Sequence, residues 1–434
     1  MNDSLKNLFT VSDLRKRVFF TLGLLAVYRI GHVITIPGVS LAALEAFAEQ
    51  LSRNSVFGLY DMFSGGNLSK VTIFALGIMP YISASIILQL LTVVWPYLEK
   101  LSKEGELGRR KITQYTRYGT ILLSIVQGAG IAIFLEKNSA PGGFHLVLNP
   151  GLAFRMMTIL TLTTGTCFIM WLGEQITERG IGNGMSLIIY SGIVVNMPRA
   201  VMQTLSQMRT GQIGFIRVLV LMLLMAAVVA AIVFVERGHR RVTVQYAKRV
   251  VGRRMYGGSS THIPLKVNTG GVIPVIFASS ILAFPATIAQ AIPGRFSEAV
   301  TTQLGFGMPL YNLLYVAGII FFAYFYTAIV FNPVDLADNM KKYGGFIPGV
   351  RPGKKTAEYI DRVLTRITLP GAIFLAMISV LPDFLIRWFN TPFYFGGTSL
   401  LIVVGVALDT VRQMESHLLM RNYEGFLRKK AKGA

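Results

Sequence analysis

The chain has 434 residues, of which 53% are hydrophobic and only 15% are charged, yet it carries a formal net charge of +21. About a quarter of the residues in a soluble domain are usually charged, so this composition and a mean hydropathy of +0.54 exclude an ordinary soluble protein. The single cysteine, Cys167, excludes an intrachain disulfide, and the five histidines lack the spacing of metal ligands, so no metal or other cofactor is expected.

Ten apolar stretches are long enough to cross a membrane, which takes about 20 residues in a helix. In chain order they are 18–36, 71–94, 118–135, 152–173, 184–203, 213–235, 268–292, 308–331, 367–388 and 395–411. We therefore expect an all-α polytopic membrane protein with ten transmembrane helices. The first stretch is expected to be retained, because no small-residue cleavage site follows it.

Lysine and arginine are concentrated in alternate loops between these stretches. Most of the 42 basic residues lie in the N-terminal segment, in loops 95–117, 236–267 and 332–366, and in the C-terminal tail. Because basic loops stay on the cytoplasmic side of a membrane, both termini are predicted to be cytoplasmic, which requires an even number of spans.

The ten spans divide into two sets of five, in residues 1–205 and 206–434. Because five is odd, the second set must cross the membrane in the opposite sense, as in inverted-repeat proteins that place a pathway between their halves. Any ten-span protein divides in this way, and the sequence has no clear internal repeat. An inverted repeat and a division without symmetry therefore both remain open.

Segment 57–68 is apolar but too short to cross the membrane, and it precedes the second span on the predicted external side. It is either re-entrant, with Gly65 and Gly66 allowing it to bend, or an external loop packed on the helix ends. Pro80 and Pro274 interrupt the second and seventh spans and are expected to kink them. Such kinks are often plain structure, but they also mark helices that move.

Polar residues within the spans are few. Ser83, Gln127 and Asn268 lie in or beside spans, where such residues commonly hold helices together. No Asp or Glu lies at the middle of a span, which argues against ion-coupled transporters and proton pumps. Arg29, in the first span, either extends toward the membrane surface or lines an aqueous cavity. The common nucleotide-binding, metalloprotease and serine-hydrolase motifs are absent, so an enzyme is not expected.

Several long runs of the sequence carry a more specific signal. They are 62–66, 74–87, 104–106, 108–111, 114–119, 171–184, 273–280, 331–333, 349–353 and 392–402; the first reads MFSGG and the ninth GVRPG. Over essentially the whole chain, these runs resemble the SecY family, the protein-conducting channels of bacteria.

This resemblance implies two five-helix halves around an hourglass pore, with a lateral gate between spans two and three on one side and seven and eight on the other. Ser83, Gln127 and Asn268 are then candidates for polar contacts of the gate. The matching positions of the pore constriction are Ile78, Ile82, Met185, Ile189, Ile276 and Ile402. A narrow apolar ring offers no fixed hydrogen bonds to varied substrates and blocks ions by dewetting; without the resemblance, these side chains would be interpreted as helix packing.

The resemblance also implies that the short external segment, about 57–68, is a plug that closes the pore from outside. Its candidate residues are Phe57, Leu59, Tyr60, Asp61, Met62, Phe63, Ser64, Gly65 and Gly66. A single charge and a small size suit a mobile stopper, and deletion of the segment is predicted to raise ion leak through the resting channel.

The two long basic loops, 236–267 and 332–366, are similar to the docking site of the motor SecA and of the ribosome. The candidate residues are Arg240, Arg241, Lys248, Arg249, Arg253, Arg254, Arg351, Lys354 and Lys355. Contacts of such residues with the phosphates of ribosomal RNA are strong and salt-sensitive. Topology alone explains some of these charges, but loop 236–267 has eight basic residues against one acidic residue, Glu236.

The function that follows is a passive conduit in the bacterial inner membrane. It would move unfolded polypeptides across the membrane and release apolar helices sideways into the lipid bilayer, driven by SecA or a translating ribosome. Signal peptides would be among its substrates, and small membrane subunits of the SecE and SecG type its partners. The alternative is a secondary transporter of a small solute, which the missing midplane carboxylates and the basic loops disfavour.

Overall fold

The apolar stretches of the sequence form helices in a computed structural model of the chain. The structure describes residues 12–40, 43–44, 64–138, 145–211, 213–246, 249–251, 254–256, 260–291, 303, 308–389 and 397–432. The chain divides into two compact units. Unit 1 comprises 1–210, 279–312 and 406–434, and unit 2 comprises 211–278 and 313–405. The expected division into halves at residue 205 stays a prediction.

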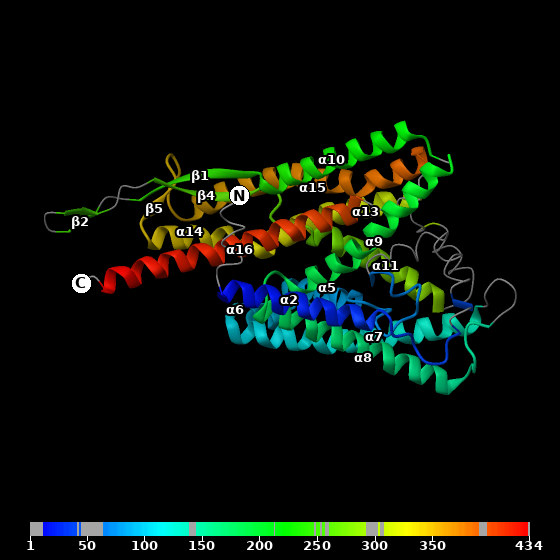
Figure 1. The fold of residues 1–434 in the computed structure, drawn as a ribbon. Helices are drawn as coiled ribbons and strands as arrows, with labels where there is room; N and C mark the ends of the chain where they lie inside the picture. Colours follow the sequence, from blue (N-terminus) through cyan, green and yellow to red (C-terminus); the bar gives the residue numbers. More distant parts are fainter. Residues whose placement is uncertain are drawn as a thin grey trace. The chain divides into compact units, whose positions relative to one another are not determined.

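Unit 1 is built from helices. They are α2 (Ser12–Gly31), α5 (Met79–Val94), α6 (Pro96–Lys103), α7 (Glu106–Lys137), α8 (Leu152–Arg179) and α9 (Gly184–Arg209), with parts of α11 (Ile273–Ala291) and α16 (Gly397–Lys432). Helices α7 and α8 lie side by side, with α5 against α7 and with α2 and α9 against α8 (Figure 1). Close packing needs small residues at the contacts, and Gly128 of α7 contacts the backbone of α8 at Ile159.

Unit 2 combines helices with two small sheets. Its elements are α10 (Phe215–Arg237), β1 (His239–Tyr246), β2 (Arg249–Val251), β3 (Arg254–Tyr256), β4 (Ser260–Lys266), most of α13 (Pro309–Val330), α14 (Pro333–Lys342), β5 (Gly345–Phe346) and α15 (Lys354–Phe389). One sheet has the antiparallel order β4-β1-β5, and β2 pairs with β3. The protein is mainly helical, as predicted, but the strands lie in the basic loops, where an all-α fold has none.

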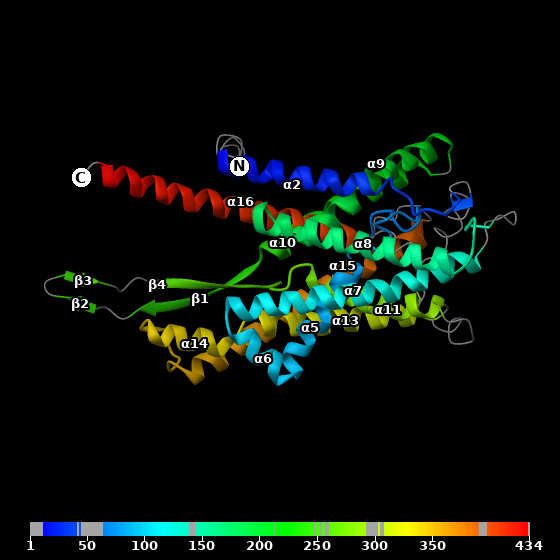
Figure 2. The same cartoon turned by 90° about the horizontal axis from the view of Figure 1, so that it is seen from below.

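Six helices in the described residues are long and apolar enough to cross a membrane, namely α7, α8, α9, α10, α13 (taken together with α14) and α15. Helices α5 and α6 would make a seventh span if taken together, although they meet at a bend of 99° (Figure 2). The bend follows from Pro96, because the residue before a proline is disfavoured in helical geometry and Trp95 is accordingly extended. Each predicted stretch overlaps a helix, but the count of ten spans stays a prediction.

The predicted second span, 71–94, is helical only from Met79. Residues 65–78 form a series of turns, with φ of +54° at Gly77 and +45° at Val71. Pro80 therefore lies in the first turn of α5, and Pro274 likewise lies in the first turn of α11. A proline there removes an N–H that has no intrahelical acceptor, so the expectation that these two prolines interrupt and kink their spans is wrong.

Candidate functional site

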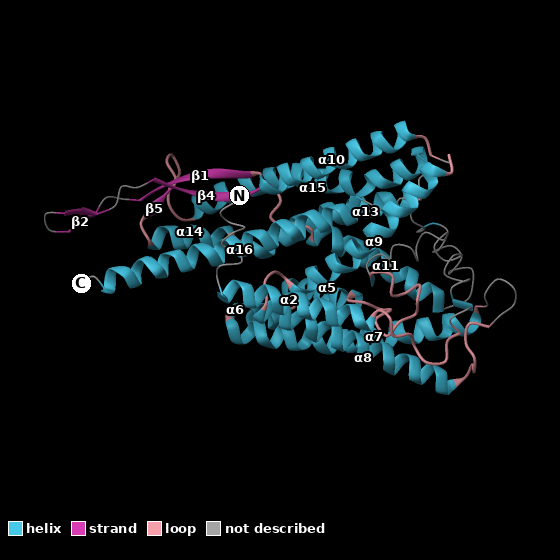
Figure 3. Cartoon of the chain, in the orientation of Figure 1, coloured by secondary structure: helices cyan, strands magenta, loops and turns pink. Residues whose placement is uncertain are grey.

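The two predicted docking loops fold around one shared core in unit 2. On β1 and β4, Val242, Val244 and Leu265 are buried and face helices α14 and α15. The helices contribute the buried side chains of Met340, Ile360, Val363, Leu364 and Ile367, with Ile347 from the connection between them. Figure 3 shows the strands beside α14. We call this structure, residues 239–246, 260–267 and 333–367, the basic platform.

The strands present basic side chains on two faces of the platform. Side chains alternate along a strand, so Arg240 and Arg241 point to opposite faces, and both are exposed. Arg241 Nε donates a hydrogen bond to His239 Nε2 at 3.3 Å. Across the ladder, His239 pairs with Lys266 and Thr243 with His262. The outer face of the hairpin is therefore cationic.

Arg351 lies on a loop whose backbone is tightly fixed. Gly349 and Gly353, on either side of it, have φ values of +82° and +98°, a region that favours glycine. The hydroxyl of Thr356, which is 1% exposed, donates to the carbonyl of Arg351 at 2.9 Å. The Arg351 side chain itself is exposed. The loop thus presents a guanidinium to solvent from a backbone whose carbonyl is held by a buried hydroxyl.

Lys354 and Lys355 begin helix α15 and are also exposed. Cations at a helix N-terminus oppose the helix dipole and cost about 0.3–1 kcal/mol each. The first turn of α15 holds no acidic residue, although Glu358 pairs with Lys355 at 2.9 Å. The two lysines therefore do not stabilise the start of their own helix through its dipole, and their docking role stays a prediction.

The remaining docking candidates lie at the β2–β3 hairpin. Lys248 and Arg253 fall outside the described residues. Arg249 and Arg254 lie in β2 and β3, where they pair with Tyr256 and Val251, respectively. Only the backbone of these strands is described, so the docking role of Arg249 and Arg254 stays a prediction.

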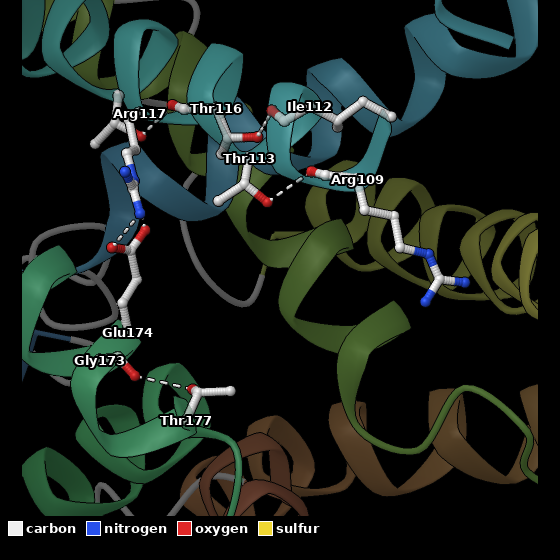
Figure 4. Close-up of polar contacts among 9 residues, drawn as sticks. Arg109, Ile112, Thr113, Thr116, Arg117, Gly173, Glu174 and Thr177 are labelled. Carbon is white, nitrogen blue, oxygen red and sulfur yellow. Dashed lines mark hydrogen bonds and ion pairs between the residues drawn. The ribbon is translucent and has the colours of Figure 1, made fainter. Parts of the chain in front are cut away.

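Several basic residues outside the platform pair with carboxylates in the described part of the chain. Arg117 of α7 forms a bidentate ion pair with Glu174 of α8, with Nε–Oε1 at 2.8 Å and Nη2–Oε2 at 2.9 Å (Figure 4). Arg110 pairs with Glu106, and Lys103 with Glu99, each four residues apart on a helix. The guanidinium of Arg109 points away from the Arg117 pair in Figure 4. No local pattern indicates the Arg117 pair, because its partners are 57 residues apart in the chain.

The six predicted pore residues are divided between the units. In unit 1, Ile78 precedes the first turn of α5, Ile82 lies one turn later, and both are buried, as is Ile189 of α9. In unit 2, the buried residues Ile276 and Ile402 lie in α11 and α16. That these residues form one ring stays a prediction.

Met185, the sixth pore candidate, is half-buried at the start of α9. Its sulfur lies directly against Gly173 of α8, where a side chain in place of the glycine hydrogen would collide with it. The thioether therefore contributes to the packing of α9 on α8. The sequence did not indicate this contact.

Most of the plug candidates lie outside the residues that the structure describes. Phe57, Leu59, Tyr60, Asp61, Met62 and Phe63 lie outside the described residues. Ser64, Gly65 and Gly66 are described, and Ser64 is fully buried. Gly65 lies so close to Gly192 of α9 that an added Cβ would approach its Cα to 2.7 Å. The C-terminal end of the predicted plug is thus a packed turn.

The polar gate candidates have different surroundings. Ser83 of α5 is half-buried and Gln127 of α7 is buried. Asn268 donates from Nδ2 to Glu236 Oε1 at 2.6 Å and to the carbonyl of Gly271 at 2.9 Å. It therefore joins the end of α10 to the turn that precedes α11. These bonds give Asn268 a structural role in unit 2, and its role in a gate stays a prediction.

Comparison with known proteins identifies close relatives. A family model described as SecY matches residues 72–411. The protein translocase subunit SecY of Escherichia coli strain K12 is 53% identical over 423 residues, covering 96% of this chain and 95% of that protein.

Two solved structures share the fold. One was reported to show that the plug domain of the SecY protein stabilises the closed state of the translocation channel, and it matches with a TM-score of 0.65 and 18% identity. The other is Sec61 in the canine ribosome-channel complex from the endoplasmic reticulum, with a TM-score of 0.62 and 15% identity. Each alignment covers 92% of this chain and 91% of the other.

Proposed function

We propose, because the chain belongs to the SecY family, that it is the central channel subunit of a protein translocase. It moves unfolded polypeptides across a membrane and releases apolar helices sideways into lipid. The observation that carries this function is the 53% identity to a translocase subunit along 96% of the chain. The same match favours a protein channel over the secondary transporter of a small solute.

The basic platform is the docking surface for the partner that drives translocation. Two observations support this role: the exposed guanidinium of Arg351 on a fixed loop, and the exposed cations Arg240 and Arg241 on a strand anchored by a buried core. A rigid cationic surface suits both ribosomal RNA phosphates and an acidic protein surface. A solved structural neighbour is a channel bound to a ribosome, and we extend the proposal to the motor SecA.

The conduit is sealed by aliphatic side chains and a plug. Ile78, Ile82, Ile189, Ile276 and Ile402 are buried aliphatic residues in, or directly before, helices of the two units, as an apolar seal requires. Met185 is retained as the sixth member, with part of its surface packed on α8. Segment 57–68 is the plug, and Ser83, Gln127 and Asn268 belong to the lateral gate.

The protein is a multi-pass protein of the bacterial inner membrane with both termini in the cytoplasm, and it is not an enzyme. The support for this orientation is the concentration of basic residues in the loops that form the platform. SecE-type and SecG-type subunits complete the translocase, and signal peptides open it.

Reconstitution tests the function directly. The chain is purified with its small subunits and placed in lipid vesicles with the motor, ATP and an unfolded secretory precursor. Protease-protected precursor should accumulate only when motor and ATP are both present. Accumulation without the chain, or uptake of small solutes in place of precursor, would contradict the proposed function.

A further inference from the structure

Residues 64–78, which we call the anchor turn, form an unusually buried loop between the plug segment and α5. Ser64, Asn67, Thr72 and Ala75 are fully buried, and Phe74 is 2% exposed. The turn is held to the segment that follows α2 by a pair of backbone hydrogen bonds, in which Ile36 N donates to Val71 O and Ile73 N to Ile34 O, both at 3.0 Å. A loop this buried needs every polar group satisfied.

Asn67 satisfies much of that requirement alone. Its Nδ2 donates to Tyr28 Oη at 3.2 Å and also to the carbonyl of Ser64. Its Oδ1 accepts from Thr72 Oγ1 at 2.9 Å and contacts Nδ1 of His32. Tyr28 Oη in turn donates to the same Ser64 carbonyl at 3.2 Å. One amide therefore links Ser64 and Thr72 of the turn to Tyr28 of α2 and to His32, the residue that follows α2.

Glycines on three helices pack closely against the anchor turn. Gly31 of α2 lies against the ring of Phe74, and Gly165 of α8 against the carbonyl of Ile73. Gly192 of α9 lies against the backbone of Gly65. At each position a side chain would collide with the turn. Interiors packed this closely shift between discrete arrangements and do not deform gradually.

We propose that the anchor turn is a fixed mount for the plug, that Asn67 is the positioning residue that holds it, and that residues 64–78 stay in place while a polypeptide crosses. The inference rests on the proposed function, because it assumes a plug before Ser64. It narrows the plug proposed above, 57–68, to the residues before Ser64.

The test combines ion conductance with amide hydrogen exchange in vesicles that contain the whole translocase. In the unaltered protein, amides of 67–77 should stay protected when a translocating chain is trapped in the channel. Asn67→Ala should lower their protection and raise the resting ion leak on the order of tenfold, the effect of leaving buried partners unsatisfied. Motor-driven translocation should persist, which general misfolding would not allow.

Matched variants separate the possible outcomes. Tyr28→Phe, which keeps the ring stacked on Phe74, removes only the hydroxyl and should give a smaller leak; Lys70→Ala, at an exposed site of the same turn, should give none. Deletion of 57–63 should raise the leak and leave 67–77 protected. If that deletion has no effect, the plug assignment fails. The proposed mount is contradicted if 67–77 lose protection in the unaltered protein while a translocating chain is trapped in the channel. It is also contradicted if neither Asn67→Ala nor Tyr28→Phe raises the ion leak.

Discussion

Arg351 combines a constrained backbone with an unconstrained side chain. The buried hydroxyl of Thr356 holds its carbonyl, and positive-φ glycines lie two residues before and after it. The backbone therefore needs little further ordering when the charge pairs with a partner, and the ordering cost is confined to the side chain. We expect Arg351→Glu to reduce motor-driven translocation on the order of tenfold or more, because breaking a charge pair in an interface costs about 2 kcal/mol or more.

The same variant should leave membrane insertion and topology unchanged, since the substitution lies in an exposed loop. Protease accessibility of the loops checks the topology, and protected precursor measures translocation. Lys341→Glu, which reverses an exposed charge on α14 of the same platform, is the matched control and should have a much smaller effect. Equal losses in the two variants would show that only the overall charge of the platform matters.

Arg117 has a structural role, because its guanidinium pairs with the carboxylate of Glu174. The bidentate pair joins α7 to α8, and the Glu174 side chain is only 16% exposed. Glu174→Gln should lower the free energy of unfolding by about 1 kcal/mol, a modest value because Arg117 is nearly half exposed and partly screened by water. Thermal midpoints in one detergent measure the change.

The control for this pair lies on the same helix. Glu106→Gln breaks the exposed pair with Arg110, whose side chains are 74% and 81% exposed, and should change stability by less than about 0.5 kcal/mol. If the two substitutions lower the midpoint equally, the α7–α8 pair has no special structural value.

At the scale of elements, the shared core makes the two platform loops one folding unit. Ile360 of α15 is 1% exposed and packs with Val242 and Val244 of β1. Ile360→Ala should destabilise the platform by about 2–5 kcal/mol. Amide exchange should therefore rise in β1 and β4, although the substitution lies about a hundred residues away in the sequence. Tyr343→Ala, at an exposed site, should leave the strands protected.

Hydropathy predicted the helices well because a long apolar run in this composition has few alternatives. The same signal misplaced residues 71–78, because apolarity reports burial and cannot distinguish a buried turn from a helix. Gly77 and Pro80 mark the true start of α5, and their meaning depends on backbone geometry that the sequence does not state. The strands were missed because Val242 and Val244 alternate over too short a distance, among arginines.

The residue types of the candidate site could be predicted from the sequence, whereas most of their contacts could not. The family motifs identified Arg351 and the buried isoleucines, because each motif assigns a role to a residue at a fixed place within it. The bond from Asn268 to Glu236 needs the β1–β4 hairpin to bring residues 32 apart together, and the Asn67 network needs α2 and the anchor turn side by side. Such contacts follow from tertiary packing and leave no local pattern.

At the scale of the whole molecule, the basic residues behind the net charge of +21 differ in whether a carboxylate pairs with them. Arg117, Arg110 and Lys103 pair with carboxylates on the helices of unit 1. Arg240, Arg241 and Arg351 are exposed on the platform of unit 2. A diffuse positive field would attract a polyanion weakly everywhere, whereas a concentrated one fixes where it docks.

The salt dependence of ribosome binding measures this division. The logarithm of affinity should fall linearly with the logarithm of salt, with a slope on the order of one for each phosphate contact. Replacing Arg240 and Arg241 with serine should reduce the slope by about two and weaken binding at low salt. Replacing Arg109 and Lys111, which are exposed on α7, with serine removes the same charge and should leave the slope nearly unchanged. Equal reductions of the slope in the two double variants would mean that ribosome binding depends on total charge alone. That result would contradict the platform as the docking surface.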